Sequence, residues 1–205
     1  MYARHRLDLG LGDLARLAFS SWRQPPPEAA LVGFSVRSEF HLLLQALDLP
    51  PGSEVLVSAV THPDMVRILE TARLVAVPVD LDLETLAPRP ELLARLAGPR
   101  TRLLLVAHLF GGRCDLEPAL RLARSRGLLL VEDCAQAFRG PGDDGEPGAD
   151  VSLFSFGTLK TATALGGALA YVRDERLRRR MAEIQAGWPA QPDREYRRKV
   201  LRHLP

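Results

Sequence analysis

Lysine is scarce in this chain. Of its 27 basic residues, 25 are arginine, and only Lys160 and Lys199 are lysine. Arginine supplies a bare positive charge but stays protonated, so it cannot form a Schiff base, whereas a desolvated lysine can. Lys160 lies in an apolar, glycine-flanked stretch, which suggests that a primary amine is required at this position.

Cysteine and long apolar runs are also few. Cys114 and Cys134 are the only cysteines, and their spacing fits neither a metal site nor a redox motif, so we expect no structural disulfide and no metal. No stretch approaches the roughly 20 apolar residues that span a bilayer. Residues 1–11 lack the apolar core of a signal peptide. These absences predict a cytoplasmic protein with no membrane association.

The charge balance is close to neutral. The net charge is +2, which gives no reason to expect nucleic acid as a partner. The basic run from Arg176 to Arg180 could touch an acidic surface, but such a run is usually the solvated face of a helix.

Short apolar runs alternate with segments of helical period along most of the chain. The runs that we predict as strands are Ala30–Phe34, Glu54–Ser58, Leu74–Pro78, Arg102–Ala107, Leu128–Glu132, Val151–Ser155 and Gly167–Val172. The segments that we predict as helices are Phe40–Leu47, Asp64–Thr71, Pro90–Leu96 and Leu116–Arg126, the last with Asp115 as N-cap and Gly127 at its end.

This alternation predicts an α/β fold, namely a three-layer αβα sandwich around a mostly parallel seven-stranded sheet. The connection from Ser155 to Gly167 is short for a helical crossover, so we expect the last strand to be reversed. The predicted divisions are an N-terminal arm over residues 1–27, a large domain over 28–173 and a helical extension over 174–205.

Ligands of such sheets bind beyond the carboxyl ends of the strands. Asp133 comes directly after a buried strand, where a carboxylate needs a positive or hydrogen-bonding partner. A protonated pyridine nitrogen would be one such partner; a loop N–H group or a metal ion would be others.

Two further strand ends carry polar candidates. Ser155 could donate a hydrogen bond to a phosphate, and Lys160, five residues later, could reach a cofactor aldehyde; the alternative for Lys160 is a solvated loop lysine. Ser35, Val36 and Arg37 lead into a helix whose first N–H groups form an anion site, although serine capping alone would also explain the segment. His62 could stack on a flat ring, or simply pack in its loop.

Taken together, these segments resemble the DegT/StrS family of sugar aminotransferases, which depend on pyridoxal phosphate (PLP) and have the aspartate-aminotransferase fold. The resemblance covers about residues 30–172. Residues 106–111, Val-Ala-His-Leu-Phe-Gly, are similar to the family's His-Leu-Tyr-Gly segment. Residues 131–137, Val-Glu-Asp-Cys-Ala-Gln-Ala, are similar to its Glu-Asp-x-Ala-Gln signature, and Ser155-Phe156 with Lys160 matches Ser-Phe-x-x-x-Lys.

The resemblance implies a role for each matching residue. Lys160 would be the Schiff-base lysine, Asp133 would pair with the pyridine nitrogen, and Gln136 would lie near the ring hydroxyl. Ser155 would bind the phosphate, and His62 would stand where the family has its aromatic ring stacker. The family implies an amino acid donor such as glutamate, a nucleotide-linked keto-sugar acceptor and a homodimer, within nucleotide-sugar metabolism and polysaccharide biosynthesis.

The chain also departs from the family. Ser35-Val36-Arg37 replaces Ser-Gly-Thr; valine does not adopt positive φ cheaply, so either Arg37 replaces the lost contacts or the phosphate is held weakly. One residue is missing from the Gly-Glu-Gly-Gly segment, here Leu165-Gly166-Gly167, and we find no small C-terminal domain. We therefore expect an aminotransferase and keep one alternative, an inactive member that acts as a binding or regulatory module. A Rossmann-type nucleotide binder would need a Gly-x-Gly-x-x-Gly segment that is absent.

Overall fold

The computed structural model describes residues 29–160, 162–192, 194–196 and 198 of the chain. Residues Ala29–Trp188 form one compact unit. The predicted N-terminal arm lies outside the described residues, as do residues 199–205 of the predicted extension. Within the described part, no helix has the length and apolar character needed to cross a membrane.

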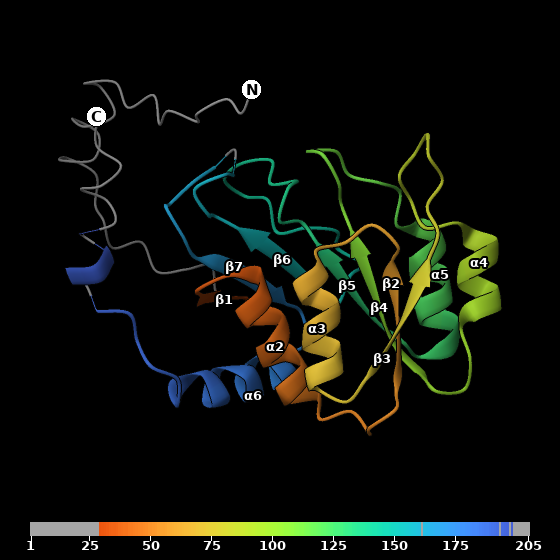
Figure 1. Ribbon diagram of the computed structural model, residues 1–205, viewed down its shortest axis with the longest axis horizontal. Helices are drawn as coiled ribbons and strands as arrows, with labels where there is room; N and C mark the ends of the chain where they lie inside the picture. Colours follow the sequence, from red (N-terminus) through yellow and green to blue (C-terminus); the bar gives the residue numbers. More distant parts are fainter. Residues whose placement is uncertain (1–28, 161, 193, 197, 199–205) are drawn as a thin grey trace. The chain divides into compact units, whose positions relative to one another are not determined.

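Seven strands form a single sheet in the order β1-β7-β6-β5-β4-β2-β3 (Figure 1). Their bounds are β1 Ala30–Gly33, β2 Glu54–Ser58, β3 Val75–Val79, β4 Thr101–Ala107, β5 Leu129–Asp133, β6 Val151–Ser155 and β7 Ala168–Val172. Strand β7 pairs antiparallel with both β6 and β1, and every other pairing is parallel. The predicted fold, including the single reversed strand, is confirmed.

Helices cover both faces of the sheet (Figure 1). The bounds are α2 Val36–Leu47, α3 Pro63–Thr71, α4 Pro90–Leu96, α5 Glu117–Arg126 and α6 Glu175–Ala186. Helices α2, α3 and α6 pack with one core cluster, which includes Phe40, Leu103 and Met181. Helices α4 and α5 pack with the opposite cluster, which includes Leu104 and Leu130.

Alternation along each strand decides which side chain reaches which layer. Leu103 and Leu105 of β4 and Val131 of β5 belong to the α2 face, whereas Leu104 and Leu130 belong to the α5 face. The same alternation sends the next two residues of β5 to opposite faces: Glu132 to the α5 face and Asp133 to the α2 face.

Several predicted element boundaries are off by one residue, and three differences concern residues singled out in the sequence. Helix α2 begins at Val36 instead of Phe40, because Ser35 and Ser38 form a reciprocal capping box in front of the apolar stripe. Helix α5 has Leu116 as its N-cap, and Asp115 instead accepts a hydrogen bond from the Glu117 N–H group at 2.9 Å. Asp133 is the last residue of β5 and does not follow it.

Candidate functional site

The carboxyl ends of β1, β2, β5 and β6 bring the predicted residues to one edge of the sheet. Asp133 ends β5 and Ser155 ends β6. Strand β2 leads to His62, and β1 leads to Ser35 at the start of α2. Parallel strands place these ends on the same side, so residues far apart in the sequence share one edge.

Asp133 is a desolvated carboxylate on this edge. Its side chain is buried, and Oδ1 accepts a hydrogen bond from the Ala135 N–H group at 2.9 Å. Burial raises the pKa of Asp133, while the hydrogen bond from Ala135 and electrostatic interactions with Lys160, His108 and His62 act in the opposite direction. Lys160 and His62 therefore lie within electrostatic reach of Asp133, and a further cationic group would offset the cost of its burial.

Lys160 follows a turn that is closed by its own N–H group, which donates to the Gly157 carbonyl at 3.0 Å. Its side chain is half-buried. Beyond it, the backbone returns through Leu165, Gly166 and Gly167, all with positive φ. Gly167 then donates to the Phe34 carbonyl at 3.1 Å, so the lysine loop is tied to the segment that precedes α2.

Gln136 is fixed from the neighbouring loop. Its Oε1 accepts a hydrogen bond from the Phe110 N–H group at 3.0 Å. Phe110 itself has a positive φ of 54°, and this bond holds the backbone in that turn. The motifs that contain His108 and Asp133 are thus joined by side-chain contacts, although they are more than twenty residues apart.

The start of α2 is well formed, and its polar side chains already have partners. Ser35 Oγ accepts from the Ser38 N–H group at 3.1 Å. Val36 is a helical residue and is not among those with positive φ, so the strain expected from replacing glycine does not arise. Arg37 donates to Asp64 at 3.0 Å and is half exposed. Because the Ser38 N–H group donates to Ser35 Oγ and the Glu39 N–H group to the Ser35 carbonyl, the N–H groups of Val36 and Arg37 are the part of the first turn that could receive an anion.

Asp64 was not predicted as a site residue, and it connects two that were. It receives hydrogen bonds from Arg37 and Arg67, and its N–H group donates to Nδ1 of His62 at 3.2 Å. His62 is thereby the N-cap of α3, with the proton of its neutral ring on Nε2. An acidic residue in the first turn of a predicted helix was the available sequence signal.

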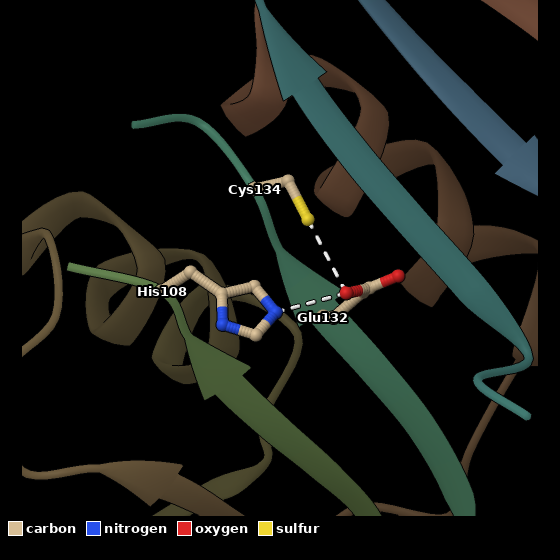
Figure 2. A group of neighbouring side chains, drawn as sticks. All are labelled: His108, Glu132 and Cys134. Carbon is tan, nitrogen blue, oxygen red and sulfur yellow. Dashed lines mark hydrogen bonds and ion pairs between the residues drawn. The ribbon is translucent and has the colours of Figure 1, made fainter. Parts of the chain in front are cut away.

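Glu132, next to Asp133, is the centre of a buried cluster (Figure 2) that the sequence did not predict. Its carboxylate accepts hydrogen bonds from His108 Nε2 at 2.9 Å, Cys134 Sγ at 3.3 Å and Ser152 Oγ at 2.6 Å. The Glu146 N–H group adds a fourth. Burial acts to raise the pKa of Glu132, but these hydrogen bonds outweigh it and bring the pKa to about 2.

His108, Glu132 and Cys134 are of residue types that bind metals, and their donor atoms lie within 4.8 Å of one another. The hydrogen bonds assign them a different role. Nδ1 of His108 accepts the Cys114 N–H group at 3.2 Å, so the ring proton is on Nε2 and points at Glu132. Because that nitrogen is a donor and both carboxylate oxygens are already bonded, the cluster is a network that ties together the ends of β4, β5 and β6.

Comparison with known proteins identifies the family. A profile of the DegT/DnrJ/EryC1/StrS aminotransferase family matches residues 33–202. The GDP-perosamine synthase of Caulobacter vibrioides is 33% identical over 160 residues, which are 76% of this chain and 42% of the relative. That of Escherichia coli O157:H7 is 33% identical over 139 residues, 67% of this chain and 38% of the relative.

Among solved structures, DesV of S. venezuelae in complex with a ketimine intermediate superposes with a TM-score of 0.69. It is 28% identical, and the match covers 87% of this chain and 53% of DesV. The chain thus spans about four-tenths of the length of the two curated relatives and about half of DesV.

Proposed function

Because the chain belongs to the DegT/DnrJ/EryC1/StrS aminotransferase family, we propose that it binds PLP at the carboxyl edge of its sheet and transfers an amino group. The proposed donor is an amino acid such as glutamate, and the proposed acceptor is a nucleotide-linked keto-sugar. The names of the two GDP-perosamine synthase relatives support that class of acceptor.

One observation carries the proposal: the buried carboxylate of Asp133 has Lys160 and His62 within electrostatic reach. The Ala135 N–H group already donates to Oδ1 of this carboxylate, and a protonated pyridine nitrogen would be a second, cationic partner. Lys160 is the only amine side chain among the described residues. The residues present therefore fit the cofactor.

When bound, PLP supplies an electron sink that stabilises negative charge developing at the substrate Cα. The chain would supply the remaining chemistry. The Lys160 amine would attach to the cofactor aldehyde and, once displaced by the donor, move the proton at Cα. Asp133 would keep the proton on the ring nitrogen, and His62 would lie against the ring. Ser155 and the N–H groups of the first turn of α2 would hold the phosphate, and Gln136 would lie near the ring hydroxyl.

We also propose that the protein works as a homodimer in the cytoplasm. Four exposed apolar side chains follow strand ends on the edge that carries the site: Phe34, Val60, Phe110 and Leu159. Exposed apolar groups gathered around one edge are typical of an interaction surface. A second copy placed there would cover them and close the site from solvent.

The cofactor proposal is tested by absorption spectroscopy of the protein incubated with PLP. We expect the near-ultraviolet to violet band of PLP bound to a lysine, and we expect Lys160→Ala to abolish it. Lys199→Ala is the matched control, since it removes the only other lysine and should keep the band. No band in the unsubstituted protein would refute cofactor binding.

A second arm of the same experiment separates turnover from binding. Adding glutamate should shift the band if the amino group is transferred. A band that stays unchanged would identify the alternative, a member that binds PLP without transamination. The observation that favours this alternative is the hydrogen bond from Arg37 to Asp64, because it occupies the arginine at the phosphate end.

A further inference from the structure

Glu39 is a buried acid that the proposed mechanism does not use. It lies in the first turn of α2, its side chain is fully buried, and neither carboxylate oxygen has a hydrogen-bond partner within the described part of the chain. Burial raises its pKa to about 7. A buried carboxyl group without a partner is costly in either form, and far more so when ionised, so its position calls for an explanation.

The carboxyl group of Glu39 packs against Gly33, the last residue of β1, which leads into the predicted phosphate end of the site. It touches Gly33 so closely that a Cβ atom on Gly33 would overlap with Oε1. Gly33 pairs with Ala168, and Ala168 pairs with Ser155 across the ends of β1, β7 and β6. The buried acid therefore lies on the row of strand ends that contains Ser155, beneath the connection from β1 to α2.

No charged group among the described residues compensates Glu39. Burial is the one cause of its raised pKa, with no contribution from a charged side chain. Basic side chains on α2 and α6 are engaged elsewhere: Arg37 donates to Asp64, His41 stacks on Trp188, and Arg178 donates to the Val172 carbonyl. Strands β1 and β7 carry no charged residue. An ionised Glu39 would thus place a bare negative charge against Gly33, two residues before the serine that caps α2.

We propose that Glu39 couples phosphate binding at the start of α2 to protonation, so that the site accepts a phosphate group only while the Glu39 carboxyl is neutral. The inference rests on the proposed function, because that function places the phosphate there. It assigns this chain a proton-dependent phosphate site, in which a cofactor phosphate and the Glu39 charge exclude each other.

The test compares PLP with pyridoxal, which lacks the phosphate, on the unsubstituted protein and on Glu39→Gln between about pH 6 and 8.5. Glutamine keeps the shape of the neutral acid at all these pH values. For PLP, the two proteins should have equal dissociation constants at the acid end. The gap should then widen towards tenfold per pH unit above the pKa of Glu39, reaching about 30-fold at the alkaline end.

The controls separate the phosphate from the other titrating groups. For pyridoxal, the ratio of the two dissociation constants should stay flat with pH, since the two proteins differ only at position 39 and pyridoxal carries no phosphate. Glu70→Gln, which removes an exposed acid of α3, should behave like the unsubstituted protein. A PLP ratio that is flat with pH would overturn the inference, and so would an equal widening with pyridoxal.

Inorganic phosphate provides a readout that does not depend on PLP chemistry. It should raise the melting temperature of the unsubstituted protein more in acid than in alkali, and that of Glu39→Gln to the same extent at both. If PLP fails to bind while phosphate shows this pattern, the cofactor proposal fails and the inference stands. If PLP binds and the phosphate effect is the same in both proteins, the inference alone is wrong. If neither ligand binds either protein, both are wrong.

Discussion

Replacing Glu132 by glutamine should lower the free energy of unfolding by about 3 kcal/mol at neutral pH. The magnitude follows from the lowering of the Glu132 pKa from 4.5 to about 2, since a pKa change of one corresponds to about 1.4 kcal/mol. The amide cannot reproduce the carboxylate, because His108, Ser152, Cys134 and the Glu146 N–H group all donate to it. The NH₂ group of glutamine would face two of these donors.

The sign of the pH dependence follows from the same shift. A lowered pKa means that Glu132 stabilises the fold fully above about pH 4.5 and loses this contribution as the pH falls towards 2. Glu132→Gln should therefore be much less stable than the unsubstituted protein at neutral pH, and the difference should shrink on acidification. Urea unfolding at several pH values, followed by circular dichroism, measures both quantities.

Glu54→Gln is the matched control for Glu132→Gln. Glu54 pairs with Arg100, whose side chain is 69% exposed, and such a pair contributes about 1 kcal/mol or less. A loss below about 1 kcal/mol in Glu132→Gln would contradict the assigned network. So would a loss that does not change with pH, because the argument requires an ionised Glu132.

Two other substitutions test the loops around the site. Gly145→Ala should lower the free energy of unfolding, measured in urea, by at least about 2 kcal/mol more than Gly142→Ala does. Both glycines have positive φ, but only at Gly145 would a Cβ atom overlap with Glu132 and Ser152. Equal costs would show that the loop moves away freely. Phe110→Asp, at a side chain 78% exposed on the site edge, should weaken the proposed homodimer at least about tenfold in sedimentation equilibrium. Val75→Asp, at the amino end of β3, should leave it intact, and a monomer in every variant would refute the dimer.

The fold could be predicted because local pattern and topology agree. Buried strands read as continuous apolar runs, and the connection between β6 and β7 was too short to cross over, so the reversed strand followed from length alone. The start of α2 could not be placed in the same way. Residues 35–39, Ser-Val-Arg-Ser-Glu, show no helical apolar stripe, and the capping box uses Ser38 in place of the usual acid or amide. The predicted helix therefore began after Glu39, and the buried acid went unnoticed.

The sequence predicted the edge of the sheet on which the candidate residues lie, but not their contacts. Asp133, Ser155, Lys160 and His62 all lie on the carboxyl edge, as parallel strands require. The Glu132 network escaped prediction because its partners, from His108 to Ser152, come from three separate segments that only the folded sheet brings together. The sequence showed two acids in succession, and it did not show that the strand sends them to opposite faces with opposite consequences for their pKa values.

The two ends of the candidate site differ in the groups that they offer to PLP. At the ring end, Asp133 is buried and unneutralised by any direct ion pair among the described residues, while Glu132 behind it fixes the strand that carries it. At the phosphate end, the Arg37 side chain is taken up by Asp64, and the buried Glu39 opposes an anion once ionised. Ser155 and backbone N–H groups are then the main donors left for a phosphate. It follows that the ring and Lys160 should contribute most of the affinity for PLP in alkaline solution, and that the phosphate should add to it only as Glu39 becomes protonated.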